Sequence, residues 1–80
     1  MNLGQGFPDW PTPKPFKDFL NDAVNADFNQ YARSPGDLSL VNALSNHYSP
    51  LMNRDIDPLN EIAVTVGATE AIYSALQANI

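Results

Sequence analysis

The end of the sequence changes from one spacing of apolar side chains to another, and no other feature limits the local structure as strongly. Ile62, Val64 and Val66 alternate with smaller residues, which predicts a strand because β-branched side chains suit a pleated, packed surface. After Gly67, from Thr69 onward, the apolar residues follow helical spacing. The sequence therefore predicts a strand, a glycine turn and a helix in direct succession.

This turn predicts either an anion site or a helix cap. The first backbone N–H groups of a helix have no partner within it, and together with the helix dipole they attract anions such as phosphate. Thr69 adds a hydroxyl there, whereas the carboxylate of Glu70 repels phosphate unless it points away. Alternatively, Thr69 caps its own helix and nothing binds. The glycine spacings of a Walker loop and of a dinucleotide fingerprint are both missing.

Length and composition exclude several classes of protein. Eighty residues form one small domain or part of a larger one. Without cysteine the chain has no disulfide and no thiolate metal site, and its single histidine, His47, cannot form a zinc site alone. A net charge of −5 with four basic residues argues against nucleic-acid and membrane partners. We expect a cytoplasmic protein, with a mitochondrial location as the alternative.

Two further helices are expected upstream. The first runs from about Pro15 to Asn25. Its apolar stripe consists of Phe16, Phe19, Leu20, Ala23 and Val24. The second begins after Asp37, which is a good N-cap, and Pro50 should kink or end it. Its buried face consists of Leu40, Val41, Leu44 and Tyr48.

The connections between these elements are polar or rich in glycine and proline. Residues 1–14 and 26–36 are predicted to be loops, and Ser-Pro-Gly at 34–36 indicates a turn. In the second loop, Tyr31 and Arg33 have side chains that could take part in binding or catalysis. From the residues alone, a half-buried tyrosine and a surface arginine are the favoured explanation. The aspartates of residues 53–60 lack the spacing, the glycine and the final glutamate of a calcium loop.

Three separated segments resemble one family. They are NLGQGFPD at 2–9, NQYARSPG at 29–36 and VTVGATEA at 64–71. In this order and spacing they resemble the N-terminal part of class I pyridoxal-phosphate aminotransferases of fold type I. The kynurenine–oxoglutarate aminotransferase (cysteine-conjugate β-lyase) branch is the most similar, and YSPL at 48–51 resembles its fungal form. The likeness covers essentially all 80 residues.

The resemblance implies an α/β fold made of a loop, two helices, one strand at 61–66 and the start of a third helix. Residues 1–80 would form one partial aminotransferase domain. Residues 1–36 would carry the substrate and cofactor loops with the first helix, and 37–80 would begin the large cofactor-binding domain. The strand would have few sheet partners within the chain.

The resemblance also implies binding roles. Gly6 matches the glycine beside the substrate carboxylate, and Phe7 and Trp10 would lie near the substrate side chain. Tyr31 matches the tyrosine that binds the cofactor phosphate of the neighbouring subunit in a homodimer. The phosphate of the subunit's own cofactor, pyridoxal 5'-phosphate, would be held by Gly67, Ala68 and Thr69. The substrates would be an amino acid such as kynurenine and a 2-oxo acid such as 2-oxoglutarate.

No catalytic residue of the family is matched in these 80 residues. The lysine that bonds to the cofactor, and the acid, asparagine, tyrosine and arginine around the cofactor and substrate, all follow these motifs in the family. Lys14 and Lys17, the only lysines, match no family motif, and no metal site is expected. We therefore expect a fragment, a truncated gene model or a remnant of an aminotransferase, which is inactive alone.

Two other functions stay open on the sequence. The chain could be a non-catalytic truncated subunit or partner-binding module, for which the cross-subunit position of Tyr31 would be suited. Alternatively, the parent could be a sister enzyme: an aspartate or aromatic aminotransferase, an aminocyclopropane-carboxylate synthase or a β-lyase. The GQGFPD loop at 4–9 favours the kynurenine branch.

Overall fold

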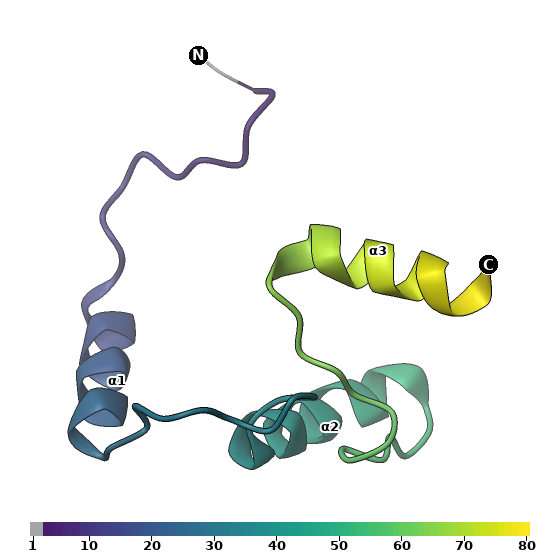
Figure 1. Cartoon of the computed structure of the whole chain (residues 1–80). Coiled ribbons are helices and arrows are strands. Elements are labelled where there is room, and N and C mark those ends of the chain that lie inside the picture. Colours follow the sequence, from purple (N-terminus) through teal and green to yellow (C-terminus); the bar gives the residue numbers. More distant parts are fainter. Residues whose placement is uncertain (1–2) are drawn as a thin grey trace. The chain divides into compact units, whose positions relative to one another are not determined.

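The computed structural model describes residues 3–80, in which three α-helices are connected by irregular segments (Figure 1). The helices are α1 (Lys14–Asn25), α2 (Leu38–Met52) and α3 (Gly67–Asn79). The chain forms two compact units, Met1–Gln30 and Tyr31–Ile80, which are described separately below.

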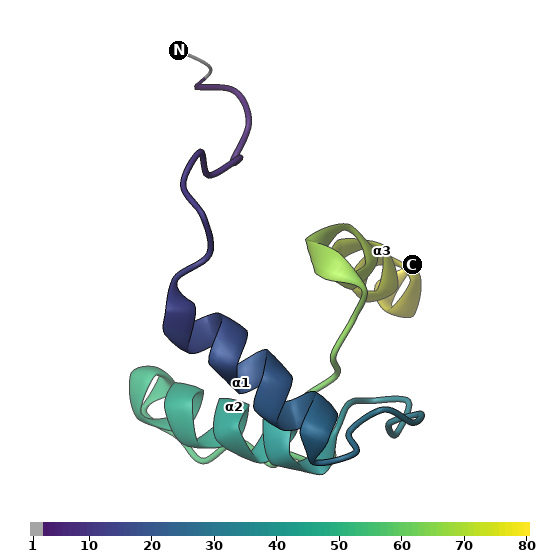
Figure 2. The same ribbon diagram turned by 90° about the vertical axis from the view of Figure 1, so that its left-hand side faces the viewer.

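The first unit consists of an irregular segment followed by α1, and it confirms the helix expected over Pro15–Asn25. Pro15 lies within the first two helical positions, where its missing N–H removes no helical bond. Asp27, with a φ of 62°, ends the helix, and the Phe28 N–H donates to the Ala23 carbonyl at 3.1 Å. The result is a regular, unbroken helix (Figure 2).

The apolar stripe of α1 lies on the surface of its unit. Phe16 and Phe19 meet edge to face, with ring centroids 6.4 Å apart. Their side chains are nonetheless mostly exposed, as are those of Leu20 and Val24. The spacing thus predicts the helix correctly, while nothing within residues 3–30 covers its apolar face.

In the second unit, α2 begins as the sequence predicts. The Asp37 carboxylate accepts hydrogen bonds from the backbone N–H groups of Ser39 (2.8 Å) and Leu40 (3.3 Å), which is the geometry of an N-cap. The helix α2 does not end at Pro50 but continues to Met52. Asn53, with a φ of 51°, then ends it. Pro50 removes one helical hydrogen bond because it has no N–H, and the helix reaches its C-cap, Asn53, three residues later.

The small core of the second unit packs against one side of α2. Its buried residues are Gly36, Val41, Ser45 and Ile56. The Ser45 hydroxyl donates to the Ile56 carbonyl at 2.6 Å, and the Ile56 N–H donates to the Ser49 hydroxyl at 3.0 Å. Leu40 and Tyr48, which were expected to be buried, are almost half exposed. The buried face of α2 is therefore rotated from the all-apolar face that the sequence predicts.

A hydrogen-bonded turn follows α2 at residues 57–61. The Asp57 carboxylate accepts from the Leu59 N–H at 2.8 Å and from the Asn60 side chain at 2.7 Å. The Glu61 carboxylate accepts from the Asp57 N–H at 2.7 Å and pairs with Arg54 at 2.8 Å. These contacts lower the pKa of both carboxyl groups. The polar connection expected here is therefore an ordered turn.

The strand expected at 61–66 is not found among residues 3–80. Residues 62–65 have no regular secondary structure, and the Val64 N–H donates to the Pro35 carbonyl at 2.8 Å. A strand is defined by a ladder of hydrogen bonds to a second strand, and the described part of the chain supplies none. The segment with β-strand spacing is therefore an irregular connection that makes one long-range backbone hydrogen bond.

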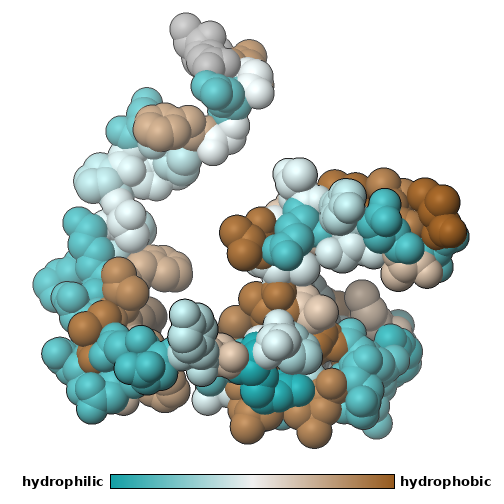
Figure 3. All heavy atoms as spheres, in the orientation of Figure 1, coloured by the Kyte–Doolittle hydropathy of each residue, from teal (hydrophilic) through white to brown (hydrophobic). Residues whose placement is uncertain are grey.

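The third helix begins at Gly67, two residues before the start expected at Thr69. Brown side chains lie along α3 (Figure 3). Ile72 and Leu76 of this helix are mostly exposed. No helix within residues 3–80 has both the length and the apolar character that a membrane span requires.

Candidate functional site

The chain enters α3 through a tight turn centred on Val66. The Gly67 N–H donates to the Thr65 carbonyl at 2.9 Å, and Val66 has φ −77° and ψ 73°. This is an inverse γ-turn, which is common at strand ends. Gly67 follows with a φ of 84°, a value that residues other than glycine rarely adopt. The glycine is therefore required by the backbone at this position.

The first turn of α3 presents backbone N–H groups without a side-chain cap. The N-cap residue of α3 is Val66, whose side chain makes no capping hydrogen bond. Thr69 lies inside the first helical turn, so the alternative that it caps its own helix is wrong. By helix geometry, the N–H groups of Ala68 and Thr69 have no partner within the helix. These donors and the Thr69 hydroxyl suit a phosphate group.

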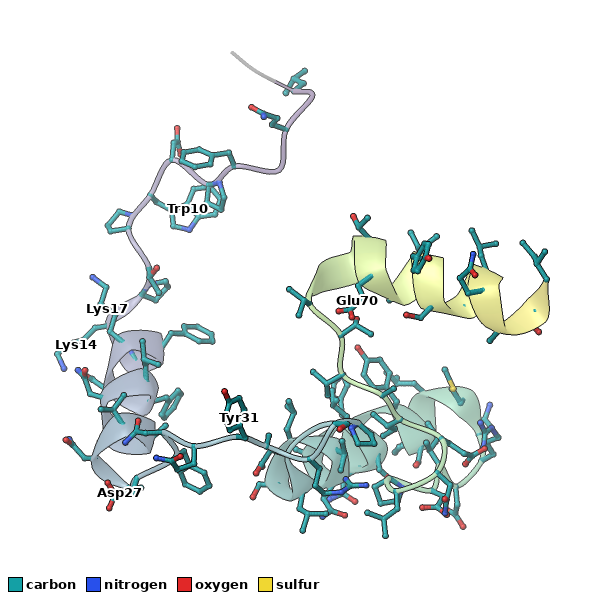
Figure 4. The ribbon with its side chains drawn as sticks, viewed as in Figure 1. Trp10, Lys14, Lys17, Asp27, Tyr31 and Glu70 are labelled. Carbon is teal, nitrogen blue, oxygen red and sulfur yellow. The ribbon has the colours of Figure 1, made fainter. Side chains whose placement is uncertain are left out.

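Glu70 lies beside these donors. Its carboxylate accepts a hydrogen bond from the Val66 N–H, one residue before the helix (Figure 4). The carboxylate therefore stabilises the turn but also places a negative charge near it. The N–H donors of Ala68 and Thr69 therefore favour phosphate binding at this turn, whereas the negative charge of Glu70 disfavours it.

Tyr31 and the substrate-binding candidates are exposed. The Tyr31 side chain is fully exposed and projects from the ribbon (Figure 4). Phe7 and Trp10 lie in the irregular segment of the first unit, with exposed side chains. No atom lies within 4 Å of the position that a Cβ on Gly6 would occupy. Asn2, the first residue of that motif, lies outside the described residues.

The predicted site residues are distributed over both units. Gly67, Ala68 and Thr69 share the first turn of α3, whereas no hydrogen bond found within residues 3–80 joins Tyr31 to them. Gly6, Phe7 and Trp10 belong to the other unit. Their roles as binding residues stay predictions.

Lys14 and Lys17, near the start of α1, do not resemble a cofactor-bonding lysine. Lys14 pairs with Asp18 at 2.6 Å, and its side chain is mostly exposed. A lysine that bonds to a cofactor is desolvated in a pocket, whereas the Lys14 side chain is exposed and held by a surface carboxylate. No group of three or more His, Asp or Glu residues within 3–80 could hold a metal ion.

One contact that the sequence did not reveal joins two of the family-like segments. Gly36 has a φ of 129° and is buried against Val41 and Val64. A Cβ on Gly36 would lie 2.6 Å from Cγ2 of Val64. The sequence indicated only a turn at Ser-Pro-Gly, because the contact with Val64 is between residues far apart in the chain. Arg33 is exposed, as expected for a surface arginine, and its guanidinium also donates to the Gly36 carbonyl at 3.2 Å.

A shallow hollow of about 320 Å³ lies beside the end of α2. Its walls are apolar except for the Arg54–Glu61 pair at the rim. The lining residues are Tyr48, Met52, Arg54, Ile56, Glu61, Ile62 and Ala63. None of the residues predicted to bind substrate or cofactor lines this hollow.

Comparison with known proteins gives consistent matches. No family model and no solved structure matches the chain. A kynurenine–oxoglutarate transaminase of Dictyostelium discoideum is 47% identical over 77 residues, covering 95% of this chain and 18% of the relative. Kynurenine–oxoglutarate transaminase 1 of Homo sapiens is 41% identical over 80 residues, covering 98% of this chain and 19% of the relative.

A relative that is named for a different substrate has a similar identity to this chain. A probable N-succinyldiaminopimelate aminotransferase of Mycobacterium tuberculosis is 42% identical over 76 residues, covering 95% of this chain and 19% of the relative. The chain thus spans about a fifth of the length of the curated relatives that it matches. These matches confirm the resemblance found in the sequence: over nearly its whole length, the chain is similar to a segment of class I pyridoxal-phosphate aminotransferases.

Proposed function

We propose that the chain is the N-terminal part of an aminotransferase of fold type I. Its parent would move an amino group from an amino acid such as kynurenine to a 2-oxo acid such as 2-oxoglutarate, as a homodimer with pyridoxal phosphate. The observation that carries this proposal is the 47% identity to a kynurenine–oxoglutarate transaminase across 95% of the chain.

The chain's own residues would bind rather than react. When bound, pyridoxal phosphate supplies the electron sink that lets an amino group move between carbon atoms. The N–H groups of Ala68 and Thr69 would hold the phosphate at the N-terminus of α3. The hydroxyl of Tyr31, exposed in this structure, would donate to the phosphate in the neighbouring subunit. Gly6 would let the substrate carboxylate approach the backbone closely.

A different amino donor is the second candidate. The 42% identity to a probable N-succinyldiaminopimelate aminotransferase is close to the values for the kynurenine transaminases. Because aminotransferases with different donors match the chain at similar identity, the 80 residues support the reaction class more strongly than the donor. The kynurenine donor is favoured because six of the similar proteins are kynurenine–oxoglutarate transaminases.

The native product tests this function. An antibody to residues 1–80 would capture the product, whose intact mass and transaminase activity with kynurenine and 2-oxoglutarate would then be measured. We expect a product several times larger than this chain, active with pyridoxal phosphate, and a recombinant 80-residue chain no more active than free cofactor. A large product that transaminates neither kynurenine nor N-succinyldiaminopimelate would contradict the proposal. So would activity of the 80-residue chain above that of the free cofactor, because the chain offers no suitable lysine.

A further inference from the structure

Residues 33–36, which follow shortly after Tyr31, form a turn with two hydrogen bonds between its first and last residues. The Gly36 N–H donates to the Arg33 carbonyl at 2.9 Å. In the opposite direction, the Arg33 guanidinium donates to the Gly36 carbonyl at 3.2 Å, in a partly buried position. Arg33 therefore holds Gly36 by its backbone and by its side chain, and the turn begins only two residues after Tyr31.

This turn is fixed to the segment that leads into α3. The Val64 N–H donates to the Pro35 carbonyl at 2.8 Å. The Val64 side chain lies directly against the Gly36 backbone, where even a single added carbon would come within 2.6 Å of it. Val41, which is completely buried, closes the other side at 3.1 Å from the same position. A backbone hydrogen bond and a packed apolar contact thus act at the same point.

The hydrogen bonds continue from Val64 into the first turn of α3. The Thr65 carbonyl accepts from the Gly67 N–H at 2.9 Å, and the Thr65 hydroxyl donates to the Gly67 carbonyl at 3.1 Å. The Val66 N–H is held by the Glu70 carboxylate. The chain from Val64 to the phosphate-binding candidates therefore has few free backbone torsions.

We propose that these contacts, here called the Gly36–Val64 junction, position the first turn of α3 relative to the Tyr31 segment. Gly36 and Val64 are positioning residues, since neither is among the predicted phosphate contacts. The inference rests on the proposed function in one respect, namely that Tyr31 and the first turn of α3 both contact cofactor phosphates. If Tyr31 serves the neighbouring subunit, as in the proposed function, the junction would link the phosphate contacts of two active sites.

Two matched variants test the junction. Val64→Ala removes the methyl groups that pack on Gly36, whereas Val66→Ala makes the same change at a side chain that is 91% exposed and nearer to the phosphate-binding turn. Amide signals of the isotope-labelled 80-residue chain would be recorded alone and during titration with inorganic phosphate. The Val41 amide signal, from the centre of the core, reports whether each variant keeps its fold.

The expected result is specific to Val64. Val64→Ala should move the Tyr31 and Arg33 amide signals and weaken phosphate binding at Ala68 and Thr69 by about tenfold, the loss expected from misplacing one donor to a charged group. Val66→Ala should do neither. Unmoved Tyr31 and Arg33 signals in a folded Val64→Ala chain would overturn the junction. If the unaltered chain binds no phosphate, the phosphate contact of the proposed function fails, while the Tyr31 and Arg33 signals still decide on the junction.

Discussion

Replacing Gly36 by alanine should destabilise the second unit more than any other glycine substitution in residues 3–80. The φ of 129° is strained for any L side chain, at roughly 1–2 kcal/mol. The added Cβ would also lie 2.6 Å from Val64 and 3.1 Å from Val41, and such overpacking typically costs roughly 1–3 kcal/mol. The two terms together give roughly 2–5 kcal/mol. Since Val41 and Ile56 are the only buried apolar side chains among residues 3–80, this loss is large for the second unit.

Two other glycines separate the strain from the clash. Gly67 has a φ of 84° but open space around its Cβ position, so Gly67→Ala should show only the strain. Gly6 has open space and no positive φ, so Gly6→Ala should change little. Urea unfolding, followed through the Val41 amide signal, gives the free energy for each variant. A loss for Gly36→Ala no greater than that for Gly67→Ala would refute the packing of Gly36 against Val64.

Two further predictions concern the core and the turn at 57–61. Ser45→Ala should lower the free energy of unfolding by about 1–3 kcal/mol, because the Ile56 carbonyl loses its hydrogen-bond donor. The control is Ser39→Ala, at an exposed position on the same helix. Equal losses for the two variants would contradict the prediction. Acid should loosen residues 57–61, because hydrogen bonds lower the pKa of Asp57 and of Glu61 in the fold. The stability that they contribute is complete above their ordinary pKa values of 3.8 and 4.5 and is lost as the pH falls through the lowered folded values. The protection of the Leu59 amide against exchange, taken relative to its intrinsic rate at each pH, should fall in that window, and Asp57→Asn should flatten the fall.

The helices could be predicted because their signals are local. The spacing of apolar residues gives α1, and Asp37 gives the start of α2 through hydrogen bonds to residues two and three positions later. The strand could not be predicted reliably from β-branched alternation, because a strand also needs a pairing partner elsewhere. The existence of an element thus follows from its own residues, whereas sheet pairing does not.

The core and the junction required the three-dimensional structure. Ser45 looks like an interruption of the apolar face of α2, yet it is buried because it satisfies the backbone of Ile56. Gly36 looks like an ordinary turn glycine, yet its contact is with Val64. The predicted face of α2 is partly exposed because residues 3–80 cover Leu40 and Tyr48 only in part. In each case the deciding partner is distant in the sequence.

The pattern of burial separates what residues 3–80 complete by themselves from what they leave open. Val41 and Ile56 are the only buried apolar side chains described, while the apolar faces of α1 and α3 are exposed. A segment that spans about a fifth of its relatives would leave such faces for other parts of the protein to cover. The Gly36–Val64 junction, by contrast, already has its hydrogen bond and its packing. If the chain is part of an aminotransferase, the link between the Tyr31 segment and the first turn of α3 is therefore formed by local contacts and does not depend on the sheet of the parent.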